Sequence, residues 1–180
     1  MKYRFILFFL VFSACQNADQ TTAIRKYFDS KTWVESLIAD LEARHPRVEK
    51  TWIYDHQTEK EEVSDINWQK ELKLFLDADL NKSSFIMSYD SVNKPHETTY
   101  RLKPGENLPV KELTVAFDTI SREPVSISCV KQSENYFFTT GSQISLSARA
   151  GKLAGYEIRS VQRLLWFKPD SSYVSGKVLH

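Results

Sequence analysis

The second half of the chain is a succession of short segments in which apolar and polar residues alternate, and this pattern constrains the fold more than any other feature. From Ser84 onward, turns rich in Pro, Gly, Asn and Ser separate these segments. Because sequential strands joined by short turns pair with their neighbours, the pattern predicts an antiparallel meander. The predicted strands span residues 85–91, 97–103, 112–118, 125–131, 136–146, 153–167 and 173–178.

Two further segments precede these strands and indicate helices. Apolar residues recur at helical spacing over residues 23–44 and again over residues 65–79, which predicts a helix in each segment. Residues 48–63 alternate on both sides of a polar turn, which predicts a hairpin between the helices. The expected fold class is α+β: two N-terminal helices packed on a curved, mostly antiparallel meander sheet of about seven to nine strands, half-barrel-like in layout.

The N-terminus carries the features of a bacterial signal peptide. Lys2 and Arg4 precede an apolar run of eight residues, and small residues lie directly before Cys15. The run is too short to cross a bilayer as a helix, which takes about 20 residues. Residues 12–15, Phe-Ser-Ala-Cys, resemble the lipobox of bacterial lipoproteins, with Phe12 in the place usually held by Leu. The resemblance implies cleavage before Cys15 and lipidation of that cysteine; the alternative is an ordinary secretory signal.

These features divide the chain into three expected parts: a signal peptide over residues 1–14, a polar tether over residues 15–22 and a single domain over residues 23–180. No Asp follows Cys15, whereas Asp at that position is the retention signal of enterobacterial inner-membrane lipoproteins. We therefore expect a lipid anchor in the outer membrane of the cell envelope, in either leaflet.

Charge and composition narrow the classes of partner. The chain has 24 Lys and Arg against 23 Asp and Glu, and loss of Lys2 and Arg4 with the signal peptide leaves 22 against 23. A protein without a basic excess has little to neutralise a phosphate backbone, so we expect no nucleic-acid partner. The five glycines form no phosphate-binding loop, and we expect no cofactor.

Two patterns raise the question of a metal site, and neither meets the requirements. Residues 77–83 begin like a calcium-binding EF-hand loop, but Lys82 and Ser88 stand where that loop needs Gly and Glu. A turn shaped by Asp79 and Asn81 at the end of the second helix is the favoured interpretation. We therefore expect no metal ion, and we expect the scattered histidines on the surface. They are His45, His56, His96 and His180.

No residue of the chain is assigned a catalytic role. Glu59, Glu61 and Glu62 could act as paired acid and base, but a charged edge strand accounts for them better. Cys129 shares one face of a predicted strand with apolar neighbours. It is therefore expected to be a buried packing residue and not a nucleophile.

Aromatic residues make up 13% of the chain, and two runs of them lie in predicted strands. The runs are Tyr136-Phe137-Phe138 and Trp166-Phe167. Such side chains usually belong to the core. A curved sheet could instead arrange them around an apolar cavity, which is the second interpretation.

Five stretches carry a resemblance to known sequences: residues 27–29, Val48 with residues 50–51, residues 68–75, residues 77–82, and residues 156–158 with Gln162. With these residues the chain resembles a group of uncharacterised lipoproteins from Bacteroidota. The resemblance implies an envelope location and a single domain, and it implies no activity.

The first functional hypothesis is a non-enzymatic, membrane-anchored envelope lipoprotein that binds an apolar ligand or a protein partner through its curved sheet. The lipid anchor, the aromatic strands and the missing catalytic motifs favour it. The first alternative is a hydrolase that acts on envelope glycan or lipid, with Glu61, Glu62, Asp77 and Asp79 as its candidate carboxylates. The second alternative is a purely structural envelope component.

Overall fold

The computed structural model describes residues 25–54 and 57–179. The expected signal peptide, Cys15 and the tether lie outside the described residues. Within the described ranges, no helix combines the length and the apolar character needed to cross a membrane.

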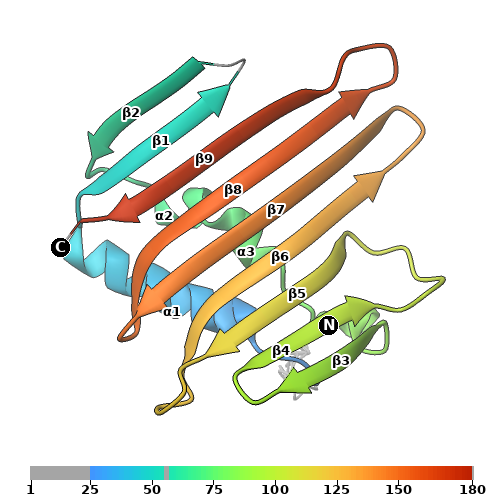
Figure 1. Ribbon diagram of the computed structural model, residues 1–180, viewed down its shortest axis with the longest axis horizontal. Helices are drawn as coiled ribbons and strands as arrows, with labels where there is room; N and C mark the ends of the chain where they lie inside the picture. Colours follow the sequence, from blue (N-terminus) through green and yellow to red (C-terminus); the bar gives the residue numbers. More distant parts are fainter. Residues whose placement is uncertain (1–24, 55–56, 180) are drawn as a thin grey trace, which may run out of the picture.

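A single antiparallel sheet of nine strands forms the body of the protein (Figure 1). Its strand order is β2-β1-β9-β8-β7-β6-β5-β4-β3. The strands are β1 (Val48–Tyr54), β2 (Gln57–Val63), β3 (Tyr89–Lys94), β4 (Glu97–Leu102), β5 (Val110–Phe117), β6 (Pro124–Glu134), β7 (Phe138–Arg149), β8 (Lys152–Leu164) and β9 (Asp170–Val178). Each strand from β3 to β8 pairs with the next along the chain, which confirms the predicted meander. The hairpin β1–β2 is also confirmed, and it joins the meander by pairing with β9.

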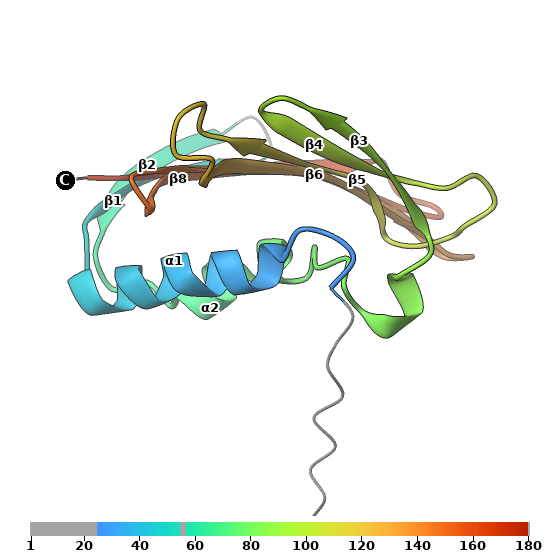
Figure 2. The ribbon, with the colours of Figure 1, turned by 90° about the horizontal axis from the view of Figure 1, so that it is seen from below.

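The helices all lie on the concave side of this sheet (Figure 2). They are α1 (Ser30–Arg44), α2 (Trp68–Glu71), α3 (Lys73–Leu76) and the 3₁₀ helix η1 (Ser83–Phe85). The helix predicted over residues 23–44 begins only at Ser30, because Asp29 accepts a hydrogen bond from the Thr32 backbone N–H and caps it.

The prediction of a second continuous helix over residues 65–79 is wrong. The segment forms two short helices that meet at Leu72, where φ is −95° and ψ is 13°. No Pro or Gly marks this break, so local propensity gives no sign of it. Leu72 and Phe75 are both fully buried, and packing against the sheet sets their positions. The predicted pair of N-terminal helices is therefore one regular helix and two single turns.

The core fills the space between the helices and the concave face of the sheet. Val34, Leu37 and Leu41 of α1 are buried there. From the sheet, alternate residues of β5 to β9 enter the same cluster, among them Leu113, Ile127, Leu146, Tyr156 and Val178.

A buried polar contact holds the short helices to the sheet. The Glu71 carboxylate of α2 accepts a hydrogen bond from the Tyr156 hydroxyl of β8 and lies 2.9 Å from the Lys50 ammonium of β1. The Lys50 and Glu71 side chains are only 12% and 18% exposed, so each charge depends on the other as its partner. Burial, together with the adjacent Glu71 carboxylate, raises the pKa of Tyr156 above its ordinary value.

Gly176 of β9 leaves the space through which the Tyr156 ring reaches Glu71. Gly176 pairs directly with Lys50 on one side and with Tyr156 on the other, so the three residues form one row on the concave face. A Cβ atom on Gly176 would overlap the Tyr156 ring. The ring lies over the glycine and reaches Glu71 from there.

We predict that Gly176→Ala lowers the free energy of unfolding by roughly 1–3 kcal/mol, because the added methyl group forces the Tyr156 ring out of its place. Urea denaturation of the purified protein measures the change. Gly141→Ala is the matched control, since no atom lies within 4 Å of its added Cβ. Equal effects of the two substitutions would contradict this account.

Candidate binding site on the uncovered face of the sheet

The convex face of the sheet, opposite the helices, is covered by none of the described elements (Figure 2). We call it the open face. Side chains alternate between the two faces of a strand, so the residues between the buried positions all lie here. In β7, for example, Ser145 and Ser147 are exposed whereas Ile144 and Leu146 are buried.

Small hydroxyl side chains form a continuous row across the open face. Each member pairs directly with the next across neighbouring strands, so all of them point to the same side. We call this the hydroxyl row, and it consists of Thr51, Ser175, Ser145, Ser128, Thr114 and Thr99, with the Glu157 carboxylate between Ser175 and Ser145. At one end of the row, the hydroxyl oxygens of Thr114 and Thr99 are hydrogen-bonded at 3.1 Å.

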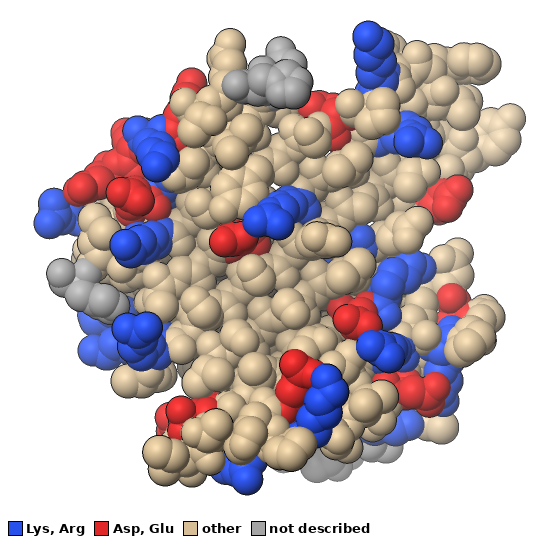
Figure 3. Space-filling view, in the orientation of Figure 1, with Lys and Arg blue, Asp and Glu red and all other residues tan. Residues whose placement is uncertain are grey.

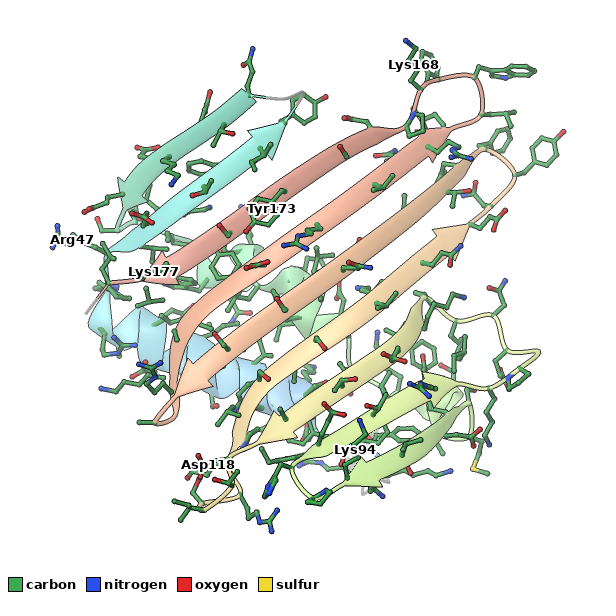
Figure 4. All side chains as sticks on the ribbon, viewed as in Figure 1. Arg47, Lys94, Asp118, Lys168, Tyr173 and Lys177 are labelled. Atoms are coloured by element: carbon green, nitrogen blue, oxygen red, sulfur yellow. The ribbon has the colours of Figure 1, made fainter. Side chains whose placement is uncertain are left out.

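The next row carries the larger side chains of the open face. Ile53, Tyr173 and Arg159 are paired in turn across β1, β9 and β8. The Arg159 guanidinium lies 5.4 Å from the centre of the Tyr173 ring, and 3.1 Å from the Glu157 carboxylate. Figure 4 labels Tyr173 on this face. The row combines an aromatic ring, a cation and an aliphatic side chain, all within reach of solvent.

The open face has several hollows, two of which lie beside Gly155 and Tyr173, and it carries few charges at its centre. One hollow of about 500 Å³ lies over Gly155, because this residue has no side chain and its neighbours on the face include several small serines. The second, of about 710 Å³, lies beside Tyr173, Ile53 and Val161. In Figure 3, which views this face, the charged side chains gather mainly along the rim. Such a surface is suited to broad contact with another molecule.

Four of the five residues in the two aromatic runs occupy neither of the predicted environments, whereas Phe138 is half-buried at the start of β7. Tyr136 and Phe137 are 82% and 68% exposed, and Trp166 and Phe167 are 86% and 71% exposed. They lie in the β6–β7 and β8–β9 loops, at one end of the sheet (Figure 1). The predictions of a core and of a cavity are therefore both wrong for these four residues. Alternation within a strand cannot show where the strand ends, and β8 ends at Leu164, before the second run.

The calcium-like segment is a structural corner, as the favoured interpretation predicted. The Asp79 carboxylate accepts a hydrogen bond from the Asn81 backbone N–H at 2.9 Å, and Asp77 is paired with Lys73. Over residues 25–54 and 57–179, no three His, Cys, Asp or Glu side chains gather as metal ligands would.

Asn81 has a second role that the sequence did not reveal. Its side-chain oxygen accepts hydrogen bonds from the backbone N–H groups of Lys26 and Tyr27, at 3.1 and 3.0 Å. Its side-chain nitrogen donates to the backbone oxygens of Tyr27 and Phe28, at 3.2 and 3.3 Å. Asn81 therefore clamps the segment that leads from the N-terminus into the domain. Two of the stretches that carried the family resemblance, residues 27–29 and 77–82, are in direct contact.

The carboxylates proposed for a hydrolase are not brought together as an acid–base pair. Glu62 on the edge strand β2 accepts a hydrogen bond from Arg47, while Asp77 and Asp79 have the partners described above. Glu59, Glu61 and Glu62 lie on a strand that is exposed almost throughout, and the charged edge interpretation is confirmed.

The remaining candidate residues are buried in the core, lie on the surface or fall outside the described residues. Cys129 is buried in the core, as predicted, and burial raises the pKa of its thiol to about 12. His45 ends α1 in a left-handed conformation with φ of 46°, and His96 lies exposed beside Arg122. Both are on the surface, as predicted. His56 and His180 lie outside the described residues.

Comparison of the chain with protein-family models, with curated proteins and with solved structures finds no significant match. The resemblance to lipoproteins from Bacteroidota therefore stays a prediction.

We predict that Asn81→Ala releases the clamped N-terminal segment, because the substitution removes all four of its hydrogen bonds to residues 26–28. The free energy of unfolding should fall by about 1–3 kcal/mol. Limited trypsin digestion followed by mass spectrometry should show faster cleavage after Lys26. Asn107→Ala, at an exposed loop position, is the control. Unchanged cleavage after Lys26 in the Asn81 variant would show that the clamp does not hold the segment.

Proposed function

We propose that this protein is a membrane-anchored, non-enzymatic lipoprotein of the cell envelope that binds a protein partner through the open face of its sheet. The observation that carries the proposal is a sheet face that none of the described elements covers, on which hydroxyl, aromatic and aliphatic side chains surround the Arg159–Glu157 ion pair.

The composition of the open face favours a protein partner. Interface centres are depleted of charged residues and rely on Tyr and Arg as anchoring side chains. Tyr173 and Arg159 are stacked near the middle of this face, and the small side chains of the hydroxyl row leave them accessible. Ile53 and Val161 add apolar contact area beside them.

The size of the open face also fits a protein partner. Seven adjacent strands, β1, β9, β8, β7, β6, β5 and β4, span about 29 Å across the sheet. The rows of paired residues from Gly155 to Val161 span about 20 Å along the strands. The product of these two spans gives the open face a flat area on the order of 600 Å², to which protruding side chains add further surface. Each partner in a standard interface contributes about 800 Å².

An apolar ligand is the other class of partner that the sequence analysis left open. A half-barrel that carries such a ligand needs an apolar hollow between its helices and its sheet. Leu72, Phe75 and Leu80 of the helical layer are fully buried in that space, packed against the sheet. Because this space is filled by core side chains, we favour a protein partner over an apolar ligand.

The anchor is tested by Cys15→Ser. If Cys15 is the lipidated residue, the substitution abolishes metabolic labelling with a fatty acid and leaves the precursor uncleaved, because lipoprotein signal peptidase acts on the lipidated cysteine. Cys129→Ser is the control and should keep both labelling and processing. Continued labelling of the Cys15 variant would contradict the proposed anchor.

The partner site is tested by Ser128→Arg and Ser145→Arg, which place bulky cations side by side in the hydroxyl row. A photo-crosslinker at position 145 first identifies the partner in intact envelopes. We expect the purified partner to bind each variant at least tenfold more weakly, because a flat interface has no space for an added Arg.

Ser133→Arg is the matched control, since Ser133 is exposed on the same strand, β6, but faces the other side of the sheet. It should leave the affinity unchanged. Equal loss of affinity in all three variants would contradict binding through the open face. A failure of the open face to crosslink to any protein would favour the purely structural alternative.

A further inference from the structure

The two aromatic loops form a single exposed apolar projection at one end of the sheet. We call it the aromatic tip, and its members are Tyr136, Phe137, Leu164, Leu165, Trp166 and Phe167. Each is exposed, with Trp166 the most exposed at 86%. By contrast, Trp68 beneath the sheet is 2% exposed, so this fold buries an indole where it has the means to do so. We propose that the aromatic tip inserts into the interfacial region of a lipid bilayer.

Hydrogen bonds hold the aromatic tip in shape without any partner. The backbone N–H of Leu165 donates to the backbone oxygen of Phe137 at 3.0 Å and ties the two loops together. The Asn135 side chain accepts hydrogen bonds from the Phe137 and Phe138 N–H groups and bends the β6–β7 turn. The Tyr136 and Phe137 rings meet edge to face with centres 5.2 Å apart. A preformed apolar surface loses little entropy when it binds.

The composition of the aromatic tip matches the bilayer interface. Trp and Tyr gather at this depth because one part of each ring system is apolar and another forms hydrogen bonds. Arg163 and Lys168 flank the tip and are exposed, where their charges can meet lipid phosphates. Two acids, Glu134 and Asp170, lie one step further back at the strand ends. Asp170 accepts a hydrogen bond from Tyr54 at 3.0 Å.

The proposal that the aromatic tip contacts a bilayer rests on the proposed function, in which a lipid on Cys15 anchors the protein to a membrane. Ten residues lead from Cys15 to Arg25, the first described residue, and even a fully extended chain of that length spans at most about 35 Å. A lipidated Cys15 would therefore keep the domain beside a bilayer, where the local concentration of lipid is high. With the aromatic tip inserted, the strand ends would point at the membrane, and the open face would remain accessible from the side.

The test uses Trp166 as its own probe. The processed, lipidated protein is placed in phosphatidylcholine and phosphatidylglycerol vesicles whose acyl chains are brominated, and the emission of Trp166→Phe is subtracted. We expect brominated lipid to quench the Trp166 emission. We also expect aqueous iodide to quench Trp166 at least threefold less in vesicles than in the protein in detergent-free solution. A Trp166 that remains open to iodide and insensitive to brominated lipid would overturn the proposal.

Substitution supplies the second arm. Trp166→Ser combined with Phe167→Ser should weaken binding of the unlipidated processed chain to the same vesicles at least tenfold. Ile120→Ser is the matched control, because Ile120 is 91% exposed in the loop after Asp118, at the opposite end of the strands from Lys168 (Figure 4). Equal vesicle binding by both variants would overturn the proposal. Acyl labelling of Cys15 is scored separately, so a failed anchor and a failed tip give different results.

Discussion

The carboxylate of Glu71 joins three parts of the chain that lie far apart in sequence. It accepts a hydrogen bond from Tyr156 and pairs with Lys50, and it does so across Gly176, the residue without a side chain between them. Helices of four residues are too short to be stable in water by themselves. The turns α2 and α3 therefore depend on this contact and on the burial of Leu72 and Phe75 for their place beneath the sheet.

The short helical layer explains the exposure of the aromatic tip, and the antiparallel sheet explains the open face. A helix of fifteen residues such as α1 is about 22 Å long, whereas a strand of thirteen residues such as β8 is about 43 Å long. The strands therefore extend beyond the helices, and the aromatic tip lies at their extended ends. An antiparallel sheet needs only one apolar face for its core, so the open face is left to solvent and to a partner. Binding and membrane contact are thus proposed for separate surfaces of one rigid sheet.

Most of the fold could be predicted from local pattern, and the candidate surfaces could not. The meander from β3 to β9 follows from alternation and turn residues, and the burial of Cys129 follows from its place in that alternation. The break at Leu72 and the clamp formed by Asn81 depend on contacts between distant segments, so no local signal marks either. The exposure of Trp166 depends on where β8 ends, and an aromatic run resembles a strand whether it is paired or projects into water.

By itself, the sequence determined a meander of about seven to nine strands, the alternation of apolar and polar sides along them and the charged character of the edge strand β2. These properties follow from residues that are neighbours along the chain, because side-chain alternation and turn chemistry act over only a few residues. Only the tertiary structure decided that β9 joins the N-terminal hairpin, that one face stays uncovered and that two aromatic loops meet at one end. Those outcomes depend on how many helical residues are available to cover the sheet and on which strands lie side by side. Both are properties of the assembled chain.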